Sequence, residues 1–145
     1  MPMIDVYAVT GTFRDKRRLA MDLAAAVMRH EQVPDISLFR QNTAAFVHDL
    51  DADSVANVDG DSNSVRVQVL TPAGTLDRDK QLGVVEELTA IVAAAADDPG
   101  LVDRTWVLIY ESPEGGWGIN GHANTGADIV AAARAELAAL AAKEA

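Results

Sequence analysis

One alternating pattern of residues occurs at two places in the sequence and indicates the fold: residues 3–9 read MIDVYAV, and residues 65–69 read VRVQV. Apolar residues alternate with more polar ones in both runs, which is the pattern of a strand with one buried face. Each run leads to a turn glycine, Gly11 or Gly74, and then to a segment with apolar residues at helical spacing. The chain is therefore predicted to contain strand, helix and strand, repeated once.

The two halves also share their internal spacing. Pro34 and Pro99, which close the two helical segments, are almost as far apart as the two turn glycines. This pattern predicts an α/β fold in which two tandem β-α-β units form a four-stranded sheet with helices on one face and right-handed crossovers. The other face would be apolar and uncovered, so we expect symmetric self-association. The predicted organisation is a single domain over residues 1–145, with an internal repeat of residues 2–48 and 65–122 and a C-terminal helix over 125–143.

Capping residues and periodicity predict the remaining elements. Thr12 and Asp15 can cap a helix that runs to about Glu31. Residues 36–47 are predicted as a second strand region, with Leu38-Phe39-Arg40 as one apolar part. The other predicted elements are an acidic loop over residues 49–64, a helix over about 76–97 carried by Leu82, Val85, Leu88 and Val92, and a buried strand over 105–110.

The composition excludes several classes of function. The chain has 145 residues, no cysteine and a formal net charge of -10. The absence of cysteine excludes disulfides and thiolate chemistry, and the negative charge argues against nucleic acid as a partner. Because no apolar run approaches the roughly 20 residues of a membrane span and the first residues do not resemble a signal peptide, we expect a soluble, cytoplasmic protein with no membrane partner.

The first two residues suggest a catalytic base. Removal of Met1 would leave Pro2 with a free secondary amine, whose pKa an apolar environment would bring towards neutrality. A base is most effective when its pKa lies near the working pH. The alternative is that Pro2 only begins a strand.

A glycine-rich segment near the end of the chain has two interpretations. Residues 116–121 match the dinucleotide-binding pattern G-x-G-x-x-G, but they follow the last predicted strand, and that motif belongs in the first turn of a β-α-β unit. A hairpin that presents Trp117 is the better interpretation. The start of a calcium loop at Asp59 lacks the required glycine and glutamate, and the three histidines are too scattered to predict a metal site.

These features together resemble the tautomerase superfamily, specifically the longer type in which two units like 4-oxalocrotonate tautomerase are joined in one chain. The resemblance rests on Pro2 before an alternating strand, the turn at Gly11, the doubled β-α-β pattern and the segment 116–121 after residues 106–111. It implies a homotrimer and a reaction without a cofactor. It also implies that Pro2 acts as general base and acid, and that Trp117 forms an aromatic wall of the site.

The arginines that hold substrate carboxylates in this superfamily have only neighbouring counterparts here. Thr12 follows the turn glycine, with Arg14 two residues later, and Phe39 stands at the strand position, with Arg40 beside it. A substrate with two carboxylates is therefore less expected than a smaller or less charged one. The candidate substrate-binding residues are Arg14, Arg40, Trp117, His48 and Asn120. Arg40 could equally be an ordinary exposed residue, and His48 and Asn120 could serve only to satisfy backbone groups.

The resulting hypothesis is an isomerase: a cofactor-independent tautomerase that moves a proton at the carbon next to a carbonyl, in a small 2-oxo acid or related carbonyl acid. Two alternatives stay open. One is a non-catalytic trimeric assembly or binding protein that keeps the fold. The other is a hydratase of the related dehalogenase or decarboxylase type, although Pro72 and Thr75 stand where such enzymes need arginines.

Overall fold

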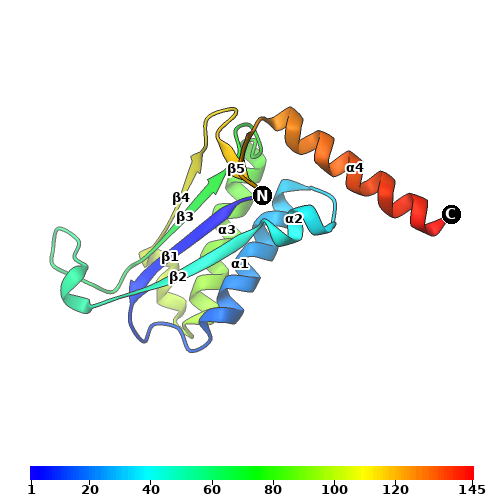
Figure 1. The fold of residues 1–145 in the computed structure, drawn as a ribbon. Coiled ribbons are helices and arrows are strands. Elements are labelled where there is room, and N and C mark those ends of the chain that lie inside the picture. Colours follow the sequence, from blue (N-terminus) through cyan, green and yellow to red (C-terminus); the bar gives the residue numbers. More distant parts are fainter.

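A four-stranded sheet in the order β2-β1-β3-β4 runs through the structure, a computed structural model that describes residues 1–145 (Figure 1). A two-stranded hairpin, β5-β6, lies outside it. The elements in chain order are β1 (Met3–Val9), α1 (Lys16–Glu31), α2 (Ser37–Gln41), β2 (Ala44–Leu50), a short 3-10 helix (Ala52–Ser54), β3 (Val65–Thr71), α3 (Arg78–Ala95), a second 3-10 helix (Pro99–Arg104), β4 (Thr105–Glu111), β5 (Trp117–Ile119), β6 (His122–Asn124) and α4 (Gly126–Glu144).

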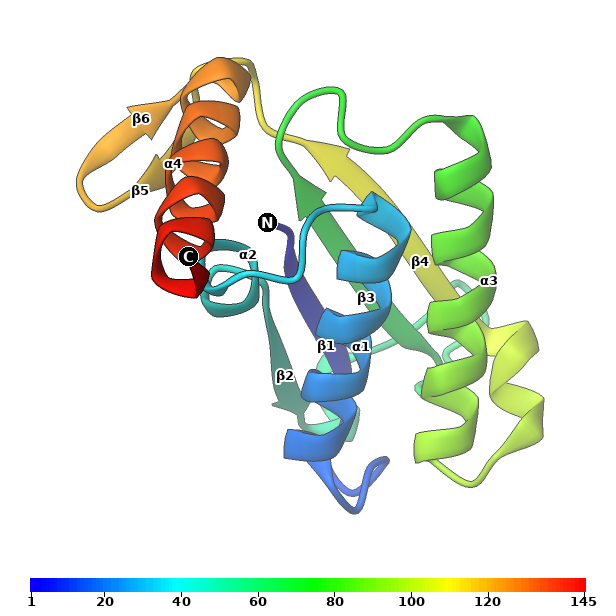
Figure 2. The ribbon, with the colours of Figure 1, turned by 90° about the vertical axis from the view of Figure 1, so that its right-hand side faces the viewer.

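The predicted doubled β-α-β arrangement is confirmed. β1 pairs in parallel with β2, and β3 in parallel with β4, while β1 and β3 are antiparallel where the two units meet. A parallel pair requires a crossover connection, and α1 and α3 supply the two crossovers. Figure 2 shows both helices side by side on one face of the sheet.

The main core lies between this sheet and the two helices. In β1 and β3 the alternating positions that face the helices are almost completely buried, as the sequence pattern requires. On α3 the buried residues include Val84, Leu88 and Val92, whereas Leu82 and Val85 are exposed. The predicted apolar stripe of this helix was therefore wrong in part, because α3 approaches α1 through Gly83 and turns Val84 inward.

The predicted strand region over residues 36–47 was also wrong in its first half. Ser37–Gln41 forms α2, and β2 begins only at Ala44 and continues to Leu50, into the predicted loop. A short apolar run fits a helix as well as a strand. Here the helix is favoured by contacts distant in sequence, since the backbone amides of Ser37 and Leu38 donate to the carboxylate of Glu136 on α4.

The face of the sheet opposite α1 and α3 carries large apolar side chains in contact with solvent. We call this surface the open face; its exposed apolar residues are Phe46, Leu70, Trp106, Leu108 and Tyr110. They occupy the strand positions that alternate with the buried core positions. The predicted uncovered apolar face is thus present.

The last helix, α4, extends away from the sheet (Figure 1). It begins with a capping box in which the Thr125 side chain accepts from the Asp128 amide and the Asp128 side chain accepts from the Thr125 amide. Only Ala133 of this helix is buried. No helix of the structure is both long and apolar enough to cross a membrane.

Candidate functional site

The amino terminus is buried in an apolar cluster that is separate from the main core. The side chains of this terminal cluster are Met1, Ile36, Phe39, Trp117 and Ala133, brought together from the start of β1, α2, β5 and α4. Pro2, between Met1 and β1, is also buried. The structure therefore places the predicted base and the predicted aromatic wall at the same end of the sheet.

A buried ion pair fixes the terminal amine. The Met1 nitrogen lies 3.1 Å from Oε1 and 3.2 Å from Oε2 of Glu31, and both groups are nearly inaccessible to solvent. Burial lowers the pKa of the Met1 amine, while the charge and hydrogen bond of Glu31 oppose this shift. Burial likewise raises the pKa of the Glu31 carboxyl, whereas the positive charges of the terminal amine and Lys80 lower it. The low-polarity environment thus favours the uncharged forms, and the pairing favours the charged forms.

Glu31 reaches this position because it continues the buried stripe of α1. Leu19, Leu23, Val27 and Glu31 follow one another at intervals of four residues and therefore lie on one helix face. The helix ends directly afterwards at Gln32, which adopts a left-handed conformation with φ 59°. Glu31 is not among the predicted site residues, although an acidic residue in register with a buried stripe is a detectable signal.

The β5-β6 hairpin positions Trp117. Asn120 and Gly121 form its turn with φ of 56° and 76°, the positive values that a tight two-residue hairpin requires. The Asn124 side chain donates to the Trp117 carbonyl at 3.0 Å, and Trp117 is 7% exposed. Asn120 is exposed at the tip of the hairpin and lies outside the terminal cluster.

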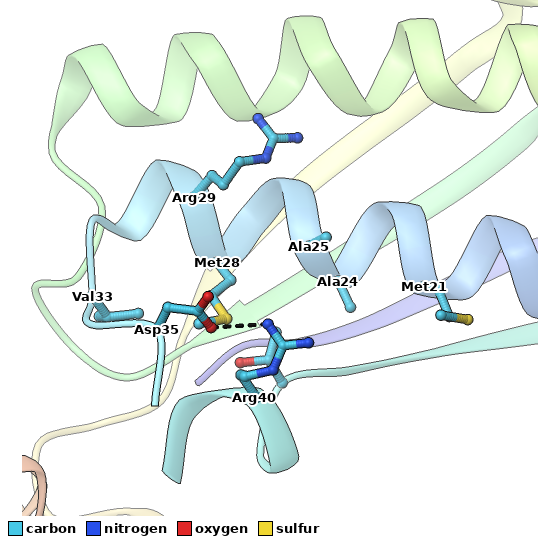
Figure 3. A pocket seen from close by; sticks show the side chains of 9 residues that line it. Met21, Ala24, Ala25, Met28, Arg29, Val33, Asp35 and Arg40 are labelled. Atoms are coloured by element: carbon cyan, nitrogen blue, oxygen red, sulfur yellow. Dashed lines mark hydrogen bonds and ion pairs between the residues drawn. The ribbon is translucent and has the colours of Figure 1, made fainter. Parts of the chain in front are cut away.

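A cavity of about 500 Å³ lies between α1 and α2 (Figure 3). The Ala44 amide donates to the Pro2 carbonyl at 3.3 Å, which places the preceding residue, Thr43, next to Pro2. Thr43 lines the cavity, and its hydroxyl is buried without a hydrogen-bond partner. The other lining residues are Met21, Ala24, Ala25, Met28, Arg29, Val33, Asp35 and Arg40. Met28 and Val33 also pack against the terminal cluster, so the cavity and the cluster adjoin.

Arg40 supplies positive charge at this cavity. It lies on α2 and not on a strand, and its Nη1 atom donates to Oδ1 of Asp35 at 2.8 Å (Figure 3). The hydrogen bond and charge of Asp35 raise the pKa of the exposed Arg40 guanidinium, which stays charged. The second guanidinium, of Arg29, is turned towards Glu87 on α3. Of the two candidate arginines, Arg40 lines this cavity and Arg14 does not.

His48 and Arg14 lie elsewhere within one chain. His48 is on the open face, where its Nε2 atom lies 2.7 Å from Oδ1 of Asp5 and its ring stacks on Tyr7 at 4.4 Å between centroids. Arg14 is exposed beyond the carboxyl end of β1, whereas Pro2 precedes the amino end, about 20 Å away along the strand. No group of three histidine, cysteine or acidic side chains could hold a metal ion.

Comparison with solved structures identifies the fold. Native fused 4-OT superimposes with a TM-score of 0.70 at 20% identity, covering 83% of this chain and 94% of that one. N1, a member of the cis-3-chloroacrylic acid dehalogenase family, gives 0.69 at 19% identity, covering 86% and 85%. Malonate semialdehyde decarboxylase gives 0.64 at 14% identity, covering 90% and 97%. The chain matches no known family model and no curated protein.

The protein therefore has the fold of the tautomerase superfamily, to which all three of these structures belong, and the predicted resemblance is confirmed at the level of the fold. Those neighbours include a fused 4-OT, a dehalogenase family member and a decarboxylase, so the fold is compatible with more than one reaction.

Proposed function

We propose that the protein is a cofactor-independent tautomerase in which Pro2, freed by removal of Met1, acts on a small 2-oxo acid or related carbonyl acid. The observation that carries this proposal is the burial of Pro2 next to an apolar aromatic cluster, which in turn adjoins a cavity that bears a guanidinium. An apolar environment favours a neutral amine, and a neutral amine is a base.

The reaction uses the amine twice. The neutral Pro2 nitrogen removes a proton from the carbon next to the substrate carbonyl, and the electrons of the broken C–H bond form the carbon–carbon double bond of the enol. The π electrons of the carbonyl move onto its oxygen, which takes the proton back from the protonated amine, so the amine ends the cycle as it began. Ketonisation of an enol is the same sequence in reverse. With Met1 still attached, the Pro2 nitrogen belongs to a peptide bond and has no basicity.

Arg40 and Trp117 bind the two ends of the substrate in this proposal. A guanidinium can hold a carboxylate through two parallel hydrogen bonds, and Arg40 would exchange its contact with Asp35 for the substrate carboxylate. Trp117 excludes water from the reacting carbon. Arg14, His48 and Asn120 do not line the cavity within one chain, so this proposal assigns them no contact with the substrate there.

We further propose that the protein is a homotrimer formed through the open face. Two fused 4-OT structures with the same fold are trimers, one asymmetric and one symmetric. The exposed apolar residues of the open face supply a surface that association would remove from water.

The second candidate is a non-catalytic assembly protein with Met1 retained. The specific observation in its favour is the ion pair of Met1 with Glu31, in which the start residue itself fills the terminal cluster. A hydratase of the dehalogenase or decarboxylase type is a further alternative on the same fold.

The intact mass of the expressed protein, combined with ketonisation of phenylenolpyruvate, tests the proposal. We expect a mass without methionine and an activity that falls at least about 100-fold in Pro2→Ala, the range of a lost general base. Pro99→Ala, which replaces an exposed proline far from the site, is the matched control and should keep wild-type activity. Retained methionine, or activity that survives in Pro2→Ala, would contradict the proposed tautomerase activity of Pro2 and favour the non-catalytic assembly protein.

A further inference from the structure

The carboxylate of Glu31 would lose its partner when Met1 is removed. Both of its oxygens accept from the Met1 amine, and its side chain is fully buried. A buried carboxylate without a partner is strongly unfavourable. The new terminal amine of Pro2 is the candidate to take the place of the Met1 amine, because its nitrogen is only three covalent bonds, or less than about 4.3 Å, from the Met1 nitrogen.

Glu31 is the carboxylate that the structure pairs with the terminal amine. From α1, Glu31 faces the terminus. From α3, Lys80 lies near Glu31, and its Nζ atom donates to the Glu31 backbone carbonyl at 3.4 Å. The neighbours from α2, β5 and α4 are apolar: Phe39, Trp117 and Ala133.

We propose that Glu31 is a positioning residue for the Pro2 amine: in the protein without Met1, its carboxylate accepts a hydrogen bond from this amine and sets the pH range in which the amine acts as a base. This inference rests on the proposed function, because it requires Pro2 to be the terminal residue. It adds a carboxylate from the end of α1 to the site.

Burial and Glu31 act on the amine in opposite directions. The apolar cluster favours the neutral amine, whereas the adjacent carboxylate favours the protonated amine, so that the same group can both take and return a proton. The negative charge also directs the substrate, because a substrate carboxylate is repelled from Glu31 and attracted to Arg40 in the cavity that adjoins the terminal cluster. Glu31 thus orients the substrate as well as the amine.

The titration of the terminal amine tests the inference directly. The protein is labelled with ¹⁵N-proline, and the Pro2 nitrogen is the one proline nitrogen of the five that titrates when Met1 is absent. In Glu31→Gln we expect its pKa to fall by about one to three pH units, the effect of removing an adjacent opposite charge. The rising limb of the kcat/KM profile should move to lower pH by the same amount. Glu86→Gln, which removes the same charge from an exposed position of α3, should leave both unchanged.

The outcomes separate this inference from the proposed function. A free Pro2 amine with the same pKa in wild type and Glu31→Gln would overturn the role of Glu31 and leave the tautomerase intact. Retained Met1 would overturn the tautomerase and the inference with it. Should Glu31→Gln fail to fold, ¹³C-glutamate labelling of the wild type replaces it. The Glu31 carboxyl signal must then change at the pH where Pro2 titrates, and a signal indifferent to Pro2 would overturn the inference.

Discussion

Gly83 of α3 lies directly against the imidazole of His30 on α1. A Cβ atom at Gly83 would come within 2.7 Å of Cε1 and 2.9 Å of Nδ1 of that ring. The ring is itself held by Glu87, whose Oε2 atom lies 3.2 Å from Nε2. The absence of a side chain at Gly83 therefore allows the two crossover helices to pack closely.

Gly83→Ala should destabilise the protein by about 1–3 kcal/mol through overpacking, although alanine is the better helix former by about 1 kcal/mol. A double-mutant cycle with His30→Ala, measured by urea unfolding, checks the cause. In the His30→Ala background the clash is absent, and Gly83→Ala should stabilise the protein. Equal destabilisation in both backgrounds would assign the effect to another contact.

Acid should weaken the contact between α1 and α3. Partial burial raises the pKa of Glu87, but the hydrogen bonds and charges of Arg29 and His30 together outweigh it and hold the pKa below 4.5. Because the folded pKa is below the unfolded one, the stabilisation is present above pH 4.5 and is lost as the pH falls through the folded pKa. Glu87→Gln should thus reduce the free energy of unfolding at pH 7, by less than about 1 kcal/mol for this half-exposed group.

Urea unfolding at pH 7 and at pH 3 measures this difference. The difference in free energy of unfolding between wild type and Glu87→Gln should be smaller at pH 3 than at pH 7. Glu86→Gln should have the wild-type free energy of unfolding at both pH values. A difference in free energy of unfolding that stays constant with pH would contradict the assigned role of the Glu87 charge.

A charge on the open face should prevent trimer formation. Leu108 is 39% exposed in the middle of β4, and Leu108→Arg would place a guanidinium where the proposed interface excludes water, so sedimentation should report a monomer. Leu82→Arg is the matched control, because Leu82 is 52% exposed on α3, outside the open face, and this variant should remain a trimer. A trimeric Leu108→Arg would show that the chains associate elsewhere.

The carboxylate of Glu136 should control the stability of α2. It accepts from the amides of Ser37 at 2.9 Å and Leu38 at 3.0 Å, while Ile36, at the cap position, contributes no side-chain hydrogen bond. Glu136→Ala should speed hydrogen exchange at these two amides roughly tenfold, as expected for loss of about 1.5 kcal/mol. Glu144→Ala, at the far end of α4, should leave them unchanged, and unaltered exchange in Glu136→Ala would exclude this cap.

The strands and long helices could be predicted because their signals are local. Alternation in β1 and β3 follows from the geometry of a half-buried strand, and Asp77 caps α3 through its own side chain. The identity of α2 could not be predicted, because Glu136, which binds its first amides, lies far away in sequence. Local patterns carry no information about such a partner.

The residues of the candidate site also differ in whether local sequence patterns could predict them. Pro2 and Trp117 were selected from short motifs, and the fold places both at one end of the sheet. Glu31 was missed because its partner is the terminal amine, which no side-chain pattern describes. His48 was predicted to bind substrate, but in the structure its ring contacts Asp5. This contact depends on the strand register, which sets Tyr7 opposite His48 and cannot be read from local patterns.

The burial of Met1 has a consequence for the timing of maturation. In the folded chain its amine is enclosed together with Glu31, and its side chain is only 2% exposed, so an aminopeptidase has no access to the first peptide bond. The proposed removal of Met1 therefore requires the nascent chain, before the sheet and α1 assemble. A molecule that folds with its initiator methionine is committed to the unprocessed form, and a mixed population would not interconvert without unfolding.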